Sequence, residues 1–169
     1  MTVEYFKMMS RYNRWMNEKL YDVCDTMPDE LRREDKGAFF KSVNGILNHL
    51  LLTDRLWLGR FTNQPFAAQS LDQELCHDWN DLKAERRETD DAIDMWLDSR
   101  SDEDLQAPFT FTGISSPIER TFPLWIVLAH WFNHQTHHRG QLTTVMEQSG
   151  YDSGATDLLL MPGARLNVD

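Results

Sequence analysis

Apolar residues recur at intervals of three and four along four long segments of the chain, the spacing that gathers them on one face of an α-helix. We predict helices over residues 2–26, 41–61, 71–99 and 122–149. The first of these ends before Pro28 and the last before Gly150, residue types that commonly end helices. Four amphipathic helices of 20 or so residues in a chain of 169 predict an all-α fold, an up-down four-helix bundle.

The connections between these helices differ in character. Residues 108–121 alternate Phe and Thr and then reach Gly113-Ile114-Ser115-Ser116-Pro117, which predicts a short hairpin between the third and fourth helices. Residues 27–40 are expected to form a loop, and residues 158–161 of the tail to pack on the bundle. No repeat or linker divides the sequence, so residues 1–169 are predicted to form a single domain.

Composition narrows the class of protein. The net charge of −10 argues against a general nucleic-acid binder, which would present a basic face to phosphates. Two cysteines, Cys24 and Cys76, are too few for a disulfide framework and fit a reducing compartment. The sequence holds no apolar run of about 20 residues and no signal-peptide pattern at its start. We therefore expect a cytoplasmic protein with neither nucleic-acid nor membrane partners.

Candidate chemistry is concentrated in the fourth predicted helix, where four of the six histidines fall within residues 130–138. His134 and His138 are one helical turn apart, about 6 Å at Cβ, and lie on or near its apolar face. Buried imidazoles need partners, and a shared metal ion would be one. Two alternatives remain open from spacing alone. The pair could be core histidines satisfied by hydrogen bonds, and His130 with His134 has the same spacing.

A third ligand would have to come from a facing helix. His49 is the candidate, because it lies in the middle of the second predicted helix close to its apolar stripe. Three histidines would leave at least one coordination position for water or substrate, as in catalytic rather than structural zinc sites. Cys24 and Cys76 lie apart from the histidines and are not expected to be ligands.

Familiar metal and nucleotide chemistries do not fit the sequence. Residues 134–138 have the spacing of a zinc-peptidase helix, but Gln135 stands where the catalytic Glu should be. A di-iron bundle needs Glu-x-x-His on two helices, and only Glu74 with His77 offers it. The sequence contains no glycine-rich phosphate loop. No carboxylate has a convincing position as a general base, so the catalytic residues stay unassigned.

Residues 133–141, Asn-His-Gln-Thr-His-His-Arg-Gly-Gln, resemble the signature of the DinB-like family of metal-binding four-helix bundles. The resemblance extends to segments 12–17, 48–50, 54–57, 150–152 and 157–159. It implies that His49, His134 and His138 are the metal ligands. It also implies a homodimer and a divalent ion, zinc or nickel, with iron or manganese as alternatives. Related branches of the family activate low-molecular-weight thiols in transfer and isomerisation reactions.

The leading hypothesis is a metal-dependent enzyme that activates a thiol or water and acts on a small molecule, as a transferase, isomerase or hydrolase. The alternative is a non-catalytic metal-binding stress-response protein. Further expectations concern residues around the site. Tyr12, Asn13 and Asn17 are expected to face the open metal position, whereas Asn48, Asp54 and Gln141 are candidates to hold the imidazoles. Gly140, inside a helix, suggests that another chain segment approaches closely.

Overall fold

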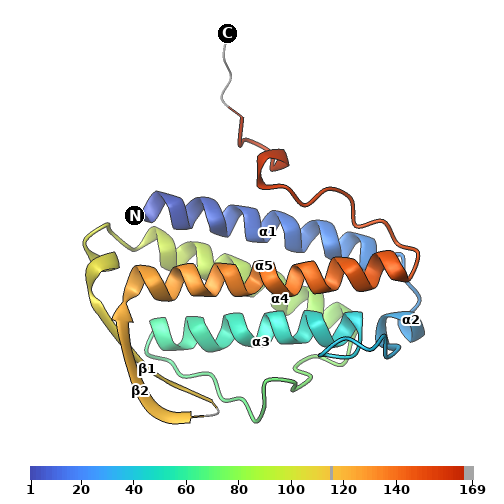
Figure 1. Ribbon diagram of the computed structural model, residues 1–169, viewed down its shortest axis with the longest axis horizontal. Coiled ribbons are helices and arrows are strands. Elements are labelled where there is room, and N and C mark those ends of the chain that lie inside the picture. The colour runs from blue at the N-terminus through green and yellow to red at the C-terminus, as the bar shows by residue number, and fades with distance from the viewer. Residues whose placement is uncertain (115, 166–169) are drawn as a thin grey trace.

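The computed structural model describes residues 1–114 and 116–165 (Figure 1). It is mostly helical, and a two-stranded sheet precedes the last helix. The elements in chain order are α1 (Val3–Asp25), α2 (Asp29–Arg33), α3 (Val43–Phe61), α4 (Trp79–Asp98), β1 (Pro108–Gly113), β2 (Ser116–Pro123) and α5 (Leu124–Gln148). Short 3-10 turns occur at Asp104–Gln106 and Leu158–Leu160. The predicted helical class and the hairpin are confirmed, and the chain adds the short helix α2 in the segment expected to be a loop.

The four long helices pack through their apolar faces. α1 contacts α4 and α5, and α3 contacts the same two helices, so each long helix has two helical neighbours. Figure 1 shows α5 running between α1 and α3. The core consists of two groups of buried side chains, one around Met16, Leu47 and Leu142 and the other around Phe6 and Trp131. Among the described residues, no helix is both long enough and apolar enough to cross a membrane.

The largest error in the predicted boundaries concerns the third long helix, which begins at Trp79 rather than at Leu71. The Asp78 side chain caps it by accepting hydrogen bonds from the amides of Asn80 and Asp81. Such a cap satisfies amides that have no partner inside the helix, and so fixes the start of the helix. Residues 71–78 are therefore free of the helix, and they run beside α3 instead, where Asn48 accepts from the amides of Leu75 and Cys76.

The hairpin covers the end of the bundle where α3 finishes and α5 begins (Figure 1). β1 and β2 pair antiparallel, with Phe109 opposite Phe122 and Phe111 opposite Arg120. The ring of Phe111 packs edge-on against Trp57 of α3, at 4.9 Å between centroids. Ser115, in the predicted turn, lies outside the described residues.

The tail after α5 returns along α1. The Tyr12 hydroxyl donates to the carbonyl of Thr156, and Lys19 donates to the carbonyl of Ala155, both at 2.5 Å. Met161 is buried, whereas Leu159 is 78% exposed, so the predicted packing of residues 158–161 holds for only part of that segment. Residues 166–169 of the tail lie outside the described residues.

Candidate metal centre

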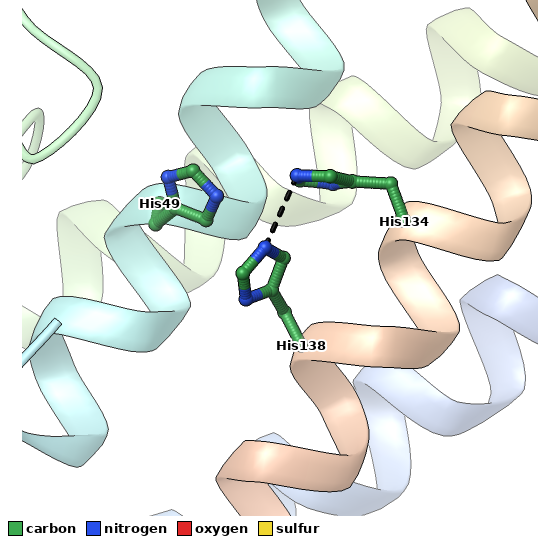
Figure 2. Close-up of side chains that lie close together, drawn as sticks. All are labelled: His49, His134 and His138. Carbon is green, nitrogen blue, oxygen red and sulfur yellow. Dashed lines mark hydrogen bonds between the residues drawn. The ribbon is translucent and has the colours of Figure 1, made fainter. Parts of the chain in front are cut away.

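Three imidazoles meet in the space between α3 and α5. His49 projects from α3, and His134 and His138 project from successive turns of α5 (Figure 2). One ring nitrogen from each lies within 4.8 Å of those from the other two. His130 stays outside the group: its ring is exposed and lies edge-on to Trp57, at 5.8 Å between centroids. The structure thus brings together the three histidines singled out in the sequence.

The outer nitrogens of two of the rings have hydrogen-bond partners. His49 Nδ1 lies 2.8 Å from the carbonyl oxygen of Leu71, and His138 Nδ1 lies 2.8 Å from Oε1 of Gln141. Because both partners are acceptors, each Nδ1 carries the proton and donates it. When Nδ1 of a neutral ring carries the proton, Nε2 carries none and offers a lone pair. Ligating histidines are commonly oriented in this way, with one nitrogen donating outward and the other available to an ion.

The inner nitrogens lack adequate partners. His134 Nε2 and His138 Nε2 lie only 3.1 Å apart (Figure 2), and His49 Nε2 is buried without a hydrogen bond. If His134 Nε2 donates its proton to His138, the Nδ1 of His134 carries a lone pair instead. That atom is also buried and has no hydrogen-bond partner in the described chain. Every neutral arrangement therefore leaves at least two buried ring nitrogens unsatisfied. Each such atom costs about 1–3 kcal/mol.

A divalent ion fits this donor set. Nitrogens bound to one tetrahedral zinc lie about 3.3 Å apart, given Zn–N distances of about 2.0–2.1 Å. The spacing of 3.1 Å between His134 and His138 is close to that value. All three ligand nitrogens lie within 4.8 Å of one another, so one ion could contact them after a small adjustment of the rings.

Burial keeps the three rings uncharged. It lowers the pKa of His49 to about 4, although the hydrogen bond to Leu71 acts in the opposite direction. Burial and the neighbouring histidines lower the pKa of His134 to about 3. Burial also lowers the pKa of His138, against the effect of Gln141. At neutral pH all three rings can therefore offer lone pairs, which a metal ligand requires.

The site is enclosed on one side. Phe40 lies flat against His49, with 3.7 Å between ring centroids, and edge-on to His138 at 5.4 Å. The loop that carries it can lie this close because residue 45 is glycine: a Cβ there would lie 2.1 Å from the Phe40 carbonyl oxygen. His49 and His138 are buried, but His134 is only partly so, and His137 on the same helix is exposed. Of the three residues, His134 is therefore the one most exposed to solvent.

Comparisons with known proteins agree with this architecture. The family model described as "DinB family" matches residues 1–165. The chain belongs to the DinB family. It is 28% identical over 155 residues to Protein DinB of Bacillus subtilis strain 168, covering 86% of this chain and 87% of that protein. The crystal structure of a DinB-like protein from Bacillus cereus ATCC 10987 superposes with a TM-score of 0.68, covering 91% of this chain and 97% of that one, at 24% identity.

The supporting contacts in this DinB-family protein differ in part from those expected. Gln141 does hold an imidazole, and its amide also lies 3.2 Å from His137 Nε2. Asn48 instead binds the backbone of residues 75 and 76, and Asp54 belongs to a separate polar cluster. Two contacts, the Leu71 carbonyl and the Phe40 ring, were not predicted, because Phe40 lies in an irregular segment and Leu71 was expected to begin a helix that starts only at Trp79.

Several further expectations are wrong. Tyr12, Asn13 and Asn17 are hydrogen-bonded to Thr156, Arg139 and Asp90 respectively, rather than facing the imidazoles. A Cβ at Gly140 would meet no atom of the described chain within 4 Å, so no segment of the chain approaches closely there. Cys24 and Cys76 are free thiols, and neither belongs to the three-histidine group, as predicted.

A second buried polar cluster lies beside the histidines and connects all four long helices. Asp54 of α3 accepts from Arg86 of α4 at 2.7 Å, from the Trp131 indole at 2.6 Å and from the Gln135 amide. Arg86 also donates to Asp90 at 2.8 Å, and Asn17 of α1 donates to the same carboxylate at 3.1 Å. We call this cluster the interhelical network; its members are Asn17, Asp54, Arg86, Asp90, Trp131 and Gln135.

Proposed function

We propose that this DinB-family protein binds one divalent metal ion through His49, His134 and His138 and uses it in catalysis. The observation that carries the proposal is the state of the inner ring nitrogens. Three uncharged imidazoles converge, with His134 Nε2 and His138 Nε2 facing each other and His49 Nε2 buried without a hydrogen-bond partner among the described residues. A bound cation would satisfy the lone pairs that face one another.

The protein side chains have distinct roles in this proposal. The Leu71 carbonyl and Gln141 Oε1 accept hydrogen bonds from Nδ1 of His49 and of His138. These bonds orient the two rings so that their Nε2 atoms point inward. Phe40 covers one side and excludes water there, whereas the partly exposed His134 marks the side open to a small molecule. When bound, a divalent ion supplies positive charge that lowers the pKa of a thiol or water it contacts, yielding a nucleophile near neutral pH.

The family resemblance favours a low-molecular-weight thiol as the molecule that is activated and zinc or nickel as the ion. Neutral imidazoles suit zinc, nickel, copper and iron alike, so the choice of ion depends on the family rather than on the donor set. The same resemblance favours a homodimer. A reaction of the transferase or isomerase type is the corresponding proposal for the chemistry.

Cobalt substitution tests the proposal directly, because Co²⁺ has visible bands that respond to its ligands. We expect one equivalent of Co²⁺ to bind and its spectrum to change when a thiol such as cysteine or 2-mercaptoethanol is added. His134→Ala should lose the bound cobalt, whereas the matched variant His77→Ala, at an exposed histidine outside the group, should retain it. Cobalt that binds without any response to thiols would contradict thiol activation. Equal binding in both variants would contradict the site itself.

The alternative of a non-catalytic metal-binding protein makes a different prediction. A structural ion would have four protein ligands and a closed shell, so thiols and anions would leave the cobalt spectrum unchanged. Only three histidines converge among the described residues, which favours an open position and therefore the catalytic proposal.

A further inference from the structure

A second candidate site lies at the end of the bundle, between α3 and the hairpin. It is a cleft of about 430 Å³ whose lining residues include Leu56, Gly59, Arg60, Phe66, Phe111 and Glu119. This volume falls within the range of small-molecule sites, about 300–1,000 Å³. None of the three converging histidines lines it. His49 and Arg60 are eleven residues apart on α3, which corresponds to about 16 Å along the helix axis.

One wall of the cleft depends on a close contact between Gly59 of α3 and the segment that follows this helix. A Cβ at this position would lie 2.7 Å from the carbonyl oxygen of Gln64 and 2.8 Å from the amide nitrogen of Phe66. The glycine therefore lets residues 64–66 turn back against α3 and form one wall. Phe111 of β1 also lines the cleft, because the hairpin lies at this end of the helices (Figure 1).

The guanidinium of Arg60 packs against two aromatic rings at this cleft, and these rings also contact each other. Its central carbon lies 4.5 Å from the centroid of Trp57 and 5.4 Å from that of Phe111. One amino group donates to the carbonyl of Thr112 at 3.1 Å. These contacts fix the plane of the guanidinium, but they use only one of its five N–H donors.

Arg60 also differs in its charge balance from three of the other partly buried arginines. Arg14, Arg33 and Arg55 are buried to a similar degree, and each pairs with a carboxylate. Over residues 1–114 and 116–165, no carboxylate lies within 4.0 Å of Arg60, although Glu119 lines the same cleft. Burial lowers its pKa, and no nearby acid opposes that effect. A half-buried positive charge without a counter-ion is unfavourable, and an anionic ligand would relieve it.

We propose that this cleft binds a small organic carboxylate with a flat apolar body, and that Arg60 contacts the carboxylate. The fork of a guanidinium matches the two oxygens of a carboxylate, and phosphate would share this charge recognition. The aromatic and leucine walls favour a ligand that also has an apolar face, which inorganic phosphate lacks. This site is independent of the metal ion and of the proposed catalytic activity.

The test is an NMR titration of the metal-free, ¹⁵N-labelled protein with benzoate, benzamide and inorganic phosphate. Chelator is present throughout, so that benzoate cannot bind a metal ion. We expect benzoate to shift the Nε–H resonance of Arg60, identified by its loss in Arg60→Gln. Benzamide, which has the same ring without the charge, should bind at least about tenfold more weakly, the effect expected for a charge-assisted contact.

Arg60→Gln should weaken benzoate binding by at least about tenfold, measured from the backbone amides that line the cleft. The matched control is Arg100→Gln, because Arg100 also lies over a tryptophan, at 5.3 Å from Trp96, but does not line the cleft. If Arg60→Gln does not fold, the comparison of benzoate with benzamide in the wild type decides. Equal binding of both compounds, binding of phosphate but not benzoate, or no shift at Arg60 would each overturn the proposal.

Discussion

The interior contains two polar clusters, one in which opposite charges are paired and one in which uncharged rings face one another. In the interhelical network, Asp54 accepts three donors from two helices, and Arg86 binds two carboxylates. In the three-histidine group, two Nε2 atoms face each other and a third has no partner. In the first cluster the charges of Asp54, Arg86 and Asp90 are paired within the chain, although Arg86 Nε and Gln135 Oε1 have no hydrogen-bond partner in the part of the chain that the structure describes, so its role is to hold the helices together. In the second cluster the ring nitrogens face one another without an adequate partner, which suits that cluster to bind a cation.

The largest loss of stability is expected when the carboxylate at the centre of the interhelical network is removed. Asp54→Ala would leave the buried guanidinium of Arg86 with only Asp90, would deprive the Trp131 indole of its acceptor and would leave Gln135 with only the Leu50 carbonyl. We expect the free energy of unfolding to fall by about 3–5 kcal/mol, the usual result of breaking a buried ion pair. Urea denaturation of metal-free protein measures it. Asp98→Ala, which removes an exposed pair with Lys7, is the control and should have no measurable effect.

Metal addition tests the other cluster. An ion that binds only the folded state should raise the free energy of unfolding by about 2.7 kcal/mol at a free concentration one hundred times its Kd. Thermal melts with zinc or nickel and with chelator measure the change. His49→Leu should abolish the stabilisation, and His77→Ala should leave it intact. Stabilisation that survives in His49→Leu would show that the ion binds elsewhere.

Acid should act on the two clusters with opposite signs. His49 has a folded pKa of about 4, below its unfolded value of about 6.5. Between these values only the unfolded chain binds the proton, so this residue makes the metal-free protein less stable as the pH falls. Burial raises the pKa of Asp54 to about 6, although Arg86 acts in the opposite direction. Between about 3.9 and 6 the folded chain binds that proton, so Asp54 stabilises as the pH falls.

Denaturation of the metal-free protein at pH 7 and pH 5 separates these effects. His49→Leu should lose less stability than the wild type over this interval, because the destabilising protonation of His49 is removed while the contribution of Asp54 is unchanged. A larger loss in the variant would contradict the low pKa assigned to His49.

The smallest predicted change in the free energy of unfolding concerns a residue that belongs to neither cluster. Gly140 lies in α5 two residues after His138, is exposed, and has open space where a Cβ would be. Gly140→Ala should stabilise the protein by about 0.5–1 kcal/mol through helix propensity alone. Thermal and urea unfolding of the metal-free variant check this. A loss of stability would mean that position 140 is in contact with another molecule.

Periodicity predicted most of the helical framework because long amphipathic segments leave a strong signal. It failed between residues 71 and 78, where the charged segment continued the helical pattern but Asp78 capped the helix later. It also missed α2, whose five residues are too few for a periodic pattern. Local capping and short-range geometry decided both cases.

At the candidate site, too, the sequence predicted contacts within one helix but not those made by loops. His134 and His138 could be paired from their spacing within one helix, whereas His49 was a candidate from its place near an apolar stripe and was favoured only with the family resemblance. Gln141 was within reach because it is one turn from His138. The contacts of Leu71 and Phe40 depend on how two loops fold over α3, and sequence distance carries no information about that. Asp54 was placed near the imidazoles by sequence, but its hydrogen bonds are instead made within the interhelical network.

Gly45 shows how a residue without a functional group can control access to a reactive centre. Its single hydrogen leaves just enough room for the backbone of residue 40, and the aromatic ring rests on His49 only because that backbone is so near. Any larger side chain at position 45 would displace the loop and lift its aromatic cover. The third imidazole would then be open to bulk water, and the centre would admit molecules from two directions instead of one.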